Sequence, residues 1–137
     1  MRLWIVRLLI GVVIAWNLQA AFIFFTWPGA FAPGFELSGI PGEAAMRGIA
    51  VLFLMWNVPY IVAAWHPLRQ LTSVKEAVVM QFLGLAGESA IYLSLSPAHA
   101  ALQGSILRFI SFDGSGLLLL LAALWLVRAE QAKKTPA

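Results

Sequence analysis

The chain has 137 residues, of which 61% are hydrophobic and 11% are charged, and its formal net charge is +3. Because an ordinary soluble domain carries about 25% charged residues, this composition is that of a membrane protein. The sequence has no cysteine, which excludes disulfides, thiol nucleophiles and thiolate metal sites. The basic residues stand at the ends of apolar segments rather than in one patch, so they indicate membrane topology and not a nucleic-acid surface.

Four apolar segments have about the length needed to cross a hydrocarbon core of ~30 Å, which takes ~20 helical residues. We therefore predict an all-α fold, a four-transmembrane-helix bundle that forms one integral membrane domain over residues 1–137. The predicted helices span about residues 3–27, 45–65, 73–95 and 105–128. A polar tail at residues 129–137 is expected to be disordered.

The first apolar segment begins with Arg2 and Arg7 and is closed by Pro28. A secretory signal peptide is the alternative interpretation, because a basic start precedes an apolar run. The run is long, however, and it contains Asn17 and Gln19 without a convincing small-residue cleavage site. These features favour a transmembrane helix.

The connection at residues 28–45 contains three prolines and four glycines together with several large apolar residues. It is therefore too apolar for a free linker. Such a segment either lies in the membrane interface as a spacer or folds back over the mouth of the bundle as a lid. The spacer is the favoured interpretation.

Two local signals bear on the second and third segments. Pro59 removes a backbone donor and is expected to kink its helix, which leaves a carbonyl near residue 55 for a neighbouring group or water to satisfy; Asn57 is well placed to help. Ser73 and Glu76 form the S-x-x-E pattern of a capping box, which predicts the start of the third helix.

The third segment carries a polar stripe, because Gln81, Gly84, Glu88 and Tyr92 follow one another at intervals of three, four and four residues. An ionisable side chain in an apolar helix costs ~3 kcal/mol on insertion scales. Glu88 is therefore expected to face the bundle interior and to find a partner there.

Each of the four helices contributes polar side chains to one predicted layer. At 1.5 Å per residue, this layer lies ~12–16 Å below the predicted outer helix ends and contains Asn17, Gln19, Asn57, Glu88 and Asp113. Arg47 and Arg108 lie above the layer, with stems long enough to reach down or to snorkel outward. We expect Glu88 to pair with one of these two arginines. Asp113 is expected to accept a hydrogen bond from one of three amides: Asn17, Gln19 or Asn57.

The basic residues also predict the orientation of the chain. Seven cations flank the side that holds the two termini: Arg2, Arg7, Arg69, Lys75, Arg128, Lys133 and Lys134. Only Arg47 and Arg108 lie toward the other side. The positive-inside rule therefore places both termini in the cytoplasm, with residues 28–45 and 96–104 outside.

The polar layer has three interpretations. It is either an internal network that fixes how the helices dock, or the floor of an outward-opening pocket for a small polar or amphipathic molecule, or a proton-coupled pathway. The two histidines, His66 and His99, have no partner at metal-ligand spacing. Because no nucleophile or phosphate loop accompanies the acids, we predict no catalytic residue, metal or cofactor.

The layout of the chain resembles the DoxX-like group of small bacterial membrane proteins. The resemblance rests on four crossings in a short chain, on the P-x-x-F-x-P pattern of Pro28, Phe31 and Pro33, on Arg47-Gly48 at the start of the second helix, and on small residues in the last one. It implies a bacterial inner membrane and permits a lipid or quinone ligand. Some members of that group are associated with quinone-linked sulfur oxidation or act as accessory membrane subunits.

The sequence thus predicts a non-enzymatic protein, either an accessory bundle or a binder of a small lipid-like or quinone-like molecule. The alternatives are a membrane subunit of a quinone-linked oxidoreductase and a proton-coupled transporter. The expected partners are the bilayer, a lipid or quinone ligand, and a membrane protein or second copy of the chain, but no nucleic acid. The candidate ligand-binding or buried polar network contains Glu88, Asp113, Arg47, Arg108, Asn17, Gln19, Asn57, Gln81 and Tyr92.

Overall fold

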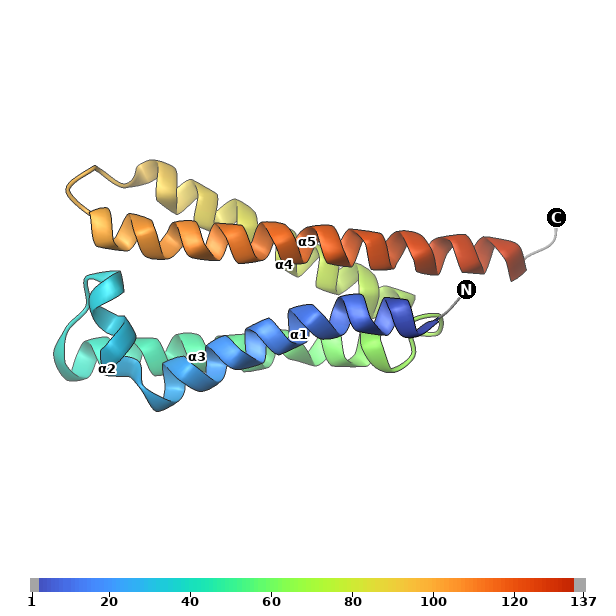
Figure 1. Cartoon of the computed structure of the whole chain (residues 1–137), viewed down its shortest axis with the longest axis horizontal. Coiled ribbons are helices and arrows are strands. Elements are labelled where there is room, and N and C mark those ends of the chain that lie inside the picture. Colours follow the sequence, from blue (N-terminus) through green and yellow to red (C-terminus); the bar gives the residue numbers. More distant parts are fainter. Residues whose placement is uncertain (1–2, 135–137) are drawn as a thin grey trace.

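The structure, a computed structural model that describes residues 3–134, is built from helices (Figure 1). The four long helices are α1 (Leu3–Thr26), α3 (Gly39–Trp65), α4 (Leu71–Ser94) and α5 (Ala100–Lys134). Two short elements join α1 to α3, namely α2 (Pro28–Phe31) and the 3-10 helix η1 (Ala32–Phe35). Each long helix is long and apolar enough to cross a membrane. The predicted all-α bundle with four membrane-spanning helices is therefore confirmed.

The four long helices form two hairpins. α1 packs against α3 and α4 against α5, and the hairpins meet through α1–α5 and α3–α4 contacts. In Figure 1 the hairpins separate toward the end that holds the connections at residues 27–38 and 95–99, which we call the loop end. The described ends of the chain lie at the opposite, terminal end, where the hairpins come together.

Two apolar clusters hold the bundle together, one toward each end. The cluster toward the terminal end joins all four long helices through Val6, Ile10, Val13, Tyr60, Ala63, Val74, Ala77, Leu120, Ala123, Leu124 and Val127. The cluster toward the loop end is built on Phe24, Ala32, Met46 and Ala50. Other large apolar side chains, such as Trp4, Phe22, Leu83 and Trp125, lie exposed on the outside, where the hydrocarbon tails of a bilayer would cover them.

Two helices extend beyond their predicted bounds. α3 begins at Gly39 rather than near residue 45, after an extended Ser38 and with a positive φ of 62° at the glycine. α5 continues to Lys134, so the expectation of a disordered tail was wrong for residues 129–134. One physical reason is that Gln131 donates a hydrogen bond to the Leu68 carbonyl at 2.9 Å, which ties the end of α5 to the α3–α4 connection. Residues 135–137 lie outside the described part of the chain.

The capping-box signal acts differently from its prediction, and Asn57 contacts another carbonyl than the expected one. The predicted capping box of Ser73 and Glu76 is not formed within the described residues. The reason is that α4 already begins at Leu71, which places Ser73 inside the first helical turn. Pro59 lies within α3 without ending it. The Asn57 amide donates to the Phe53 carbonyl at 2.7 Å instead of reaching the carbonyl near residue 55.

The α1–α3 connection folds into a compact turn over the loop end. Pro28 occupies the first position of α2, where the missing N–H is not needed. Glu36 takes a left-handed conformation, with φ of 57°, and ends η1. Residues 28–35, which we call the cover segment, contact both α3 and α5. The segment therefore folds back over the loop end, which is the position that the lid interpretation expects.

Candidate ligand site between the helical hairpins

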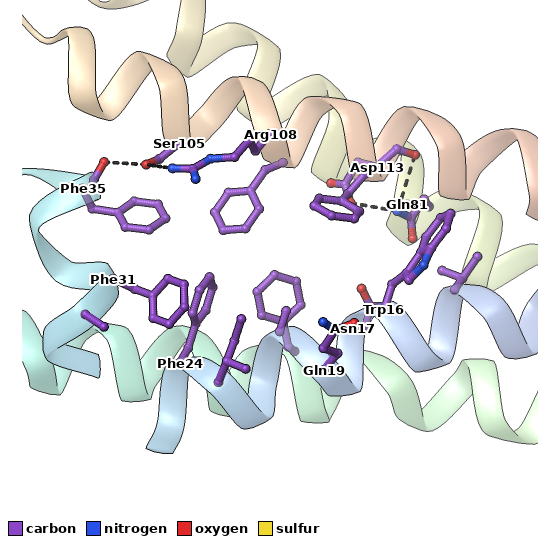
Figure 2. Close-up of a pocket in the computed structure, with 18 residues that line it drawn as sticks. Trp16, Asn17, Gln19, Phe24, Phe31, Phe35, Gln81, Ser105, Arg108 and Asp113 are labelled. Atoms are coloured by element: carbon purple, nitrogen blue, oxygen red, sulfur yellow. Dashed lines mark hydrogen bonds between the residues drawn. The ribbon is translucent and has the colours of Figure 1, made fainter. Parts of the chain in front are cut away.

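A cavity of about 340 Å³ lies between α1 and α5 beneath the cover segment (Figure 2). Aromatic and aliphatic side chains form most of its wall, and polar side chains stand at its two ends. Arg108 and Ser105 lie at the end near the cover segment, whereas Asp113 and Gln81 lie at the deep end. This first cavity therefore has an apolar middle and chemically different ends.

A second cavity of about 370 Å³ lies between α3 and the α4–α5 hairpin. Its wall is mainly apolar, with aliphatic and aromatic side chains, and includes Glu88 and Trp56. Six residues line both cavities: Asn17, Phe35, Phe53, Gln81, Phe109 and Asp113. The two cavities are therefore neighbours, and the Gln81–Asp113 pair faces both of them.

An aromatic cluster separates the cavities and supports the cover segment. Its rings come from five different elements, and the Phe24 ring lies 5.0–6.3 Å, between ring centroids, from each of the others: Phe31, Phe35, Phe53 and Phe109. Edge-on and tilted pairs at such separations contribute about 0.5–1.5 kcal/mol each beyond the area they bury. Sequence reasoning missed this cluster, because its members are single phenylalanines on separate segments.

The polar centre is a chain of hydrogen bonds that joins α3, α4 and α5. The Tyr60 hydroxyl donates to Gln81 Oε1 at 2.8 Å, and Gln81 Nε2 donates to Asp113 Oδ1 at 2.8 Å. Tyr60 is fully buried and Gln81 is 4% exposed. Because a buried polar group without a partner is costly, this chain fixes how the three helices dock. Tyr60 was not among the predicted residues, and the sequence carries no signal for its pairing with Gln81.

Two glycines make room for the polar centre. A Cβ atom at Gly84 would collide with the Asp113 carboxylate, and one at Gly116 would lie 2.7 Å from Gln81 Nε2. The absence of a side chain at both positions lets α4 and α5 approach closely at the level of the hydrogen bonds. Gly84 belongs to the predicted polar stripe, but its role depends on a contact with another helix.

The Glu88 carboxyl group lies beside that of Asp113. Glu88 Oε2 and Trp56 Nε1 are both buried, and neither makes a hydrogen bond of standard geometry among the described residues, although the Trp56 side chain lies near the Tyr60 hydroxyl. Buried polar atoms are nearly always paired in folded proteins, so these two atoms on the wall of the second cavity are places where a bound molecule or water would fit. Neighbouring carboxyl groups can also pass a proton between them.

The expected ion pairs are not formed within residues 3–134. Arg47 pairs with Glu43 at 3.4 Å, one turn earlier on the same helix. Arg108 instead donates to the Ser105 hydroxyl at 3.0 Å, one turn toward the start of α5. The pairing of Glu88 with either arginine was therefore wrong, because both guanidinium groups find partners on their own helices.

Six of the nine candidate residues line one or both cavities: Asn17, Gln19, Gln81, Glu88, Arg108 and Asp113. The other three, Arg47, Asn57 and Tyr92, line neither. Asp113 takes its hydrogen bond from Gln81 and not from one of the three amides that were expected. The position of Gln81 on the polar stripe made it a candidate. Its hydrogen bond to Asp113, however, forms only because α4 packs against α5.

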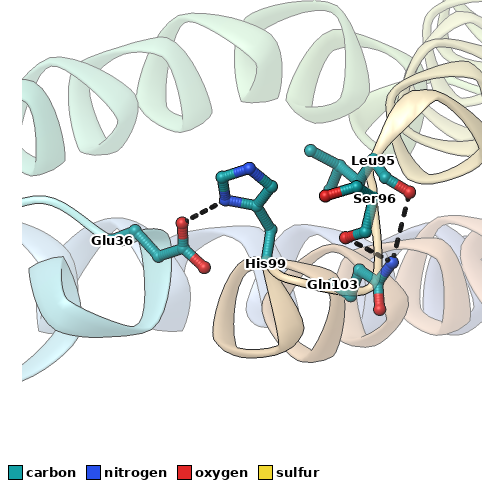
Figure 3. A network of polar contacts seen from close by, with 5 residues as sticks. All are labelled: Glu36, Leu95, Ser96, His99 and Gln103. Atoms are coloured by element: carbon teal, nitrogen blue, oxygen red, sulfur yellow. Dashed lines mark hydrogen bonds and ion pairs between the residues drawn. The ribbon is translucent and has the colours of Figure 1, made fainter.

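Two polar ties hold the cover segment and its flank to the start of α5. The buried Ser105 hydroxyl donates to the Gly34 carbonyl at 2.6 Å. At the surface, His99 Nδ1 lies 2.6 Å from Glu36 Oε2 (Figure 3). Beside it, Gln103 makes longer hydrogen bonds to the carbonyls of Leu95 and Ser96. These ties close the α1–α5 cavity at the loop end.

We expect the Ser105→Ala variant to loosen the cover segment. Removing the hydroxyl leaves the Gly34 carbonyl unpaired, and a net hydrogen bond contributes about 0.5–1.5 kcal/mol. Amide hydrogen exchange in residues 28–37 should therefore become about fivefold faster. Ser111→Ala is the control, because the exposed Ser111 hydroxyl bonds only within its own helix, to the Leu107 carbonyl. Equal exchange rates in both variants would show that Ser105 does not hold the segment.

Comparisons of the chain with known protein families, with curated proteins and with solved structures find no match. The resemblance to the DoxX-like group therefore stays a prediction.

Proposed function

We propose that this protein binds a small amphipathic, lipid-like or quinone-like molecule between its helical hairpins, without catalysing a reaction. The observation that carries the proposal is the first cavity, whose aromatic middle lies between polar ends. Ligand sites are typically apolar pockets with a few polar groups that set the orientation of the ligand. An amphipathic molecule matches this distribution better than a fully polar or fully apolar one.

The unpartnered buried atoms of the neighbouring cavity support the same proposal. Glu88 Oε2 can accept a hydrogen bond and Trp56 Nε1 can donate one, and both line the second cavity. If the polar residues served only to dock the helices, these atoms would be expected to pair with other protein atoms, because an unpaired buried polar group costs about 1–3 kcal/mol. A polar group of the bound molecule would satisfy them.

The proposed location is the bacterial inner membrane, with both termini in the cytoplasm. The described cations of the terminal end support this orientation: Arg7, Arg69, Lys75, Arg128 and Lys133. The positive-inside rule then places the cover segment and the cavities in the outer half of the bilayer. A ligand would enter from the outer leaflet.

The proposal is tested by filling the first cavity. Ala20 lines this cavity, whereas Ala15 is exposed on the same helix and lines neither cavity. Ala20→Phe should reduce the amount of co-purifying amphiphile roughly tenfold, because overpacking a filled site costs about 1–3 kcal/mol. The measurement is mass spectrometry of small molecules extracted after purification in a mild detergent.

Ala15→Phe is the matched control and should retain the wild-type amount of bound molecule. Thermal unfolding of both variants checks that each is folded. If every co-purifying molecule were recovered equally from the two variants, the proposed site would be wrong.

A further inference from the structure

Arg108 is an exposed residue that lines the first cavity and forms no ion pair within the described residues. Its guanidinium lies at the end near the cover segment, where it donates to Ser105. All six acidic side chains of the sequence fall within the described residues, and none forms an ion pair with Arg108. A guanidinium in an apolar helix normally pairs with an acid or marks a functional pathway.

The acids of the site lie at the other end of the cavity. Asp113 follows Arg108 by five residues on α5, which corresponds to ~7.5 Å along the helix axis. Glu88 lies beside Asp113. The cavity therefore has a basic end under the cover segment and an acidic deep end, separated by the aromatic wall. An anionic group would be attracted to the first end.

We infer that the ligand is an anionic amphiphile, with a carboxylate or a phosphate that binds Arg108 and an apolar portion that fills the aromatic cavity. This inference rests on the proposed function and narrows its ligand class. Carboxylate and phosphate oxygens match the planar fork of N–H donors on a guanidinium. Ser105 keeps this fork in place from one side, and the cover segment closes over it.

Tryptophan fluorescence provides a direct test, because Trp16 lines the first cavity. The protein is placed in phosphatidylcholine nanodiscs and titrated with doxyl-labelled stearic acid, and in parallel with its methyl ester. The acid should quench Trp16 at about tenfold lower concentration than the ester, because a charge-assisted hydrogen bond is about twice as strong as a neutral one. Trp16→Phe identifies the signal that comes from the other tryptophans.

A second pair of probes distinguishes the two sources of the anionic group. Doxyl-labelled phosphatidic acid is compared with doxyl-labelled phosphatidylcholine under the same conditions. A preference for the stearic acid indicates a free fatty acid, and a preference for phosphatidic acid indicates a phospholipid headgroup. Either preference supports the inference.

Arg108→Gln should abolish the preference for the anionic probe and leave quenching by the ester intact, which also shows that the cavity persists in the variant. Arg47→Gln is the control and should keep the preference, because Arg47 pairs with Glu43 and lines neither cavity. Loss of the preference in both arginine variants would overturn the inference.

Equal quenching by the anionic and neutral members of both probe pairs in the wild type would overturn the inference and leave the proposed function standing. No quenching of Trp16 by any of the probes would overturn both. Because these readings use the wild-type protein, they do not depend on whether Arg108→Gln folds.

Discussion

The Gln81→Leu variant should lose about 2 kcal/mol of unfolding free energy, because the side chain links three helices inside the bundle. Leucine has a similar size but leaves the Tyr60 hydroxyl and one Asp113 oxygen without their present partners. A stranded buried group costs about 1–3 kcal/mol in soluble proteins. Hydrogen bonds between membrane helices contribute ~0.6 kcal/mol on average and up to ~1.7. Two such bonds give about 1.2 kcal/mol on average and at most about 3.4 kcal/mol, and the expected loss lies within this range.

The measurement is reversible unfolding in mixed micelles with increasing dodecyl sulfate, followed by circular dichroism. Gln19→Leu is the matched control. The Gln19 side chain lines the same cavity and makes no hydrogen bond within the described chain. Its unfolding free energy should change by less than about 0.5 kcal/mol. Adding Tyr60→Phe to Gln81→Leu should recover part of the loss, since it removes the stranded hydroxyl. An equal loss in the two glutamine variants would contradict the structural role of Gln81.

The Gly84→Ala variant is expected to lose a similar amount, about 2 kcal/mol, through overpacking. The new Cβ would collide with the Asp113 carboxylate and lie 3.5 Å from the Trp56 ring. A shift of the Asp113 side chain would relieve the collision but would disturb its hydrogen bond from Gln81. The variant is therefore destabilised either by the collision or by the weakened bond.

Gly87→Ala provides the control for Gly84→Ala on the same helix. A Cβ atom at Gly87 would meet nothing within 4 Å, so the better helix propensity of alanine should leave the stability unchanged or raise it by up to about 1 kcal/mol. In a double-mutant cycle, Asp113→Ala should reduce the penalty of Gly84→Ala by more than about 0.5 kcal/mol. Equal losses for the two glycine variants, or no coupling with Asp113, would show that the close contact is not responsible.

These variants also separate the two main interpretations of the polar centre. The hydrogen bonds among Tyr60, Gln81 and Asp113 account for the docking of α3, α4 and α5. Glu88 lies beside Asp113 at the end of that chain, and its buried Oε2 makes no hydrogen bond of standard geometry within the described residues. The docking of the helices is therefore carried by this hydrogen-bonded chain, whereas the proposed ligand-binding role rests on Glu88 and on the walls of the two cavities.

The local pairs show why some sequence-based expectations were wrong. Glu43 and Arg47 are four residues apart on one helix, and Ser105 and Arg108 are three apart. Such neighbours meet without any help from the rest of the fold. The interhelical ion pairs expected for Glu88 compete with these local partners. The local partners win because they lie on the same helix as each arginine.

The sequence by itself determined the helical class, the four membrane-crossing segments and the polar stripe of the third segment. Each of these properties depends on the hydrophobicity or the periodicity of one segment, because a helix in lipid satisfies its own backbone and needs no partner to form. Proline and glycine near residues 28–42 likewise marked the place of the cover segment.

Only the tertiary structure decided which polar residues meet. The pairing of Gln81 with Tyr60 and Asp113, the close contact at Gly84 and the aromatic cluster around Phe24 depend on the relative rotation and depth of different helices. A change of one residue in register rotates a side chain by about 100° around the helix axis. For that reason, single-segment patterns place a polar layer at a depth in the membrane but do not assign its partners.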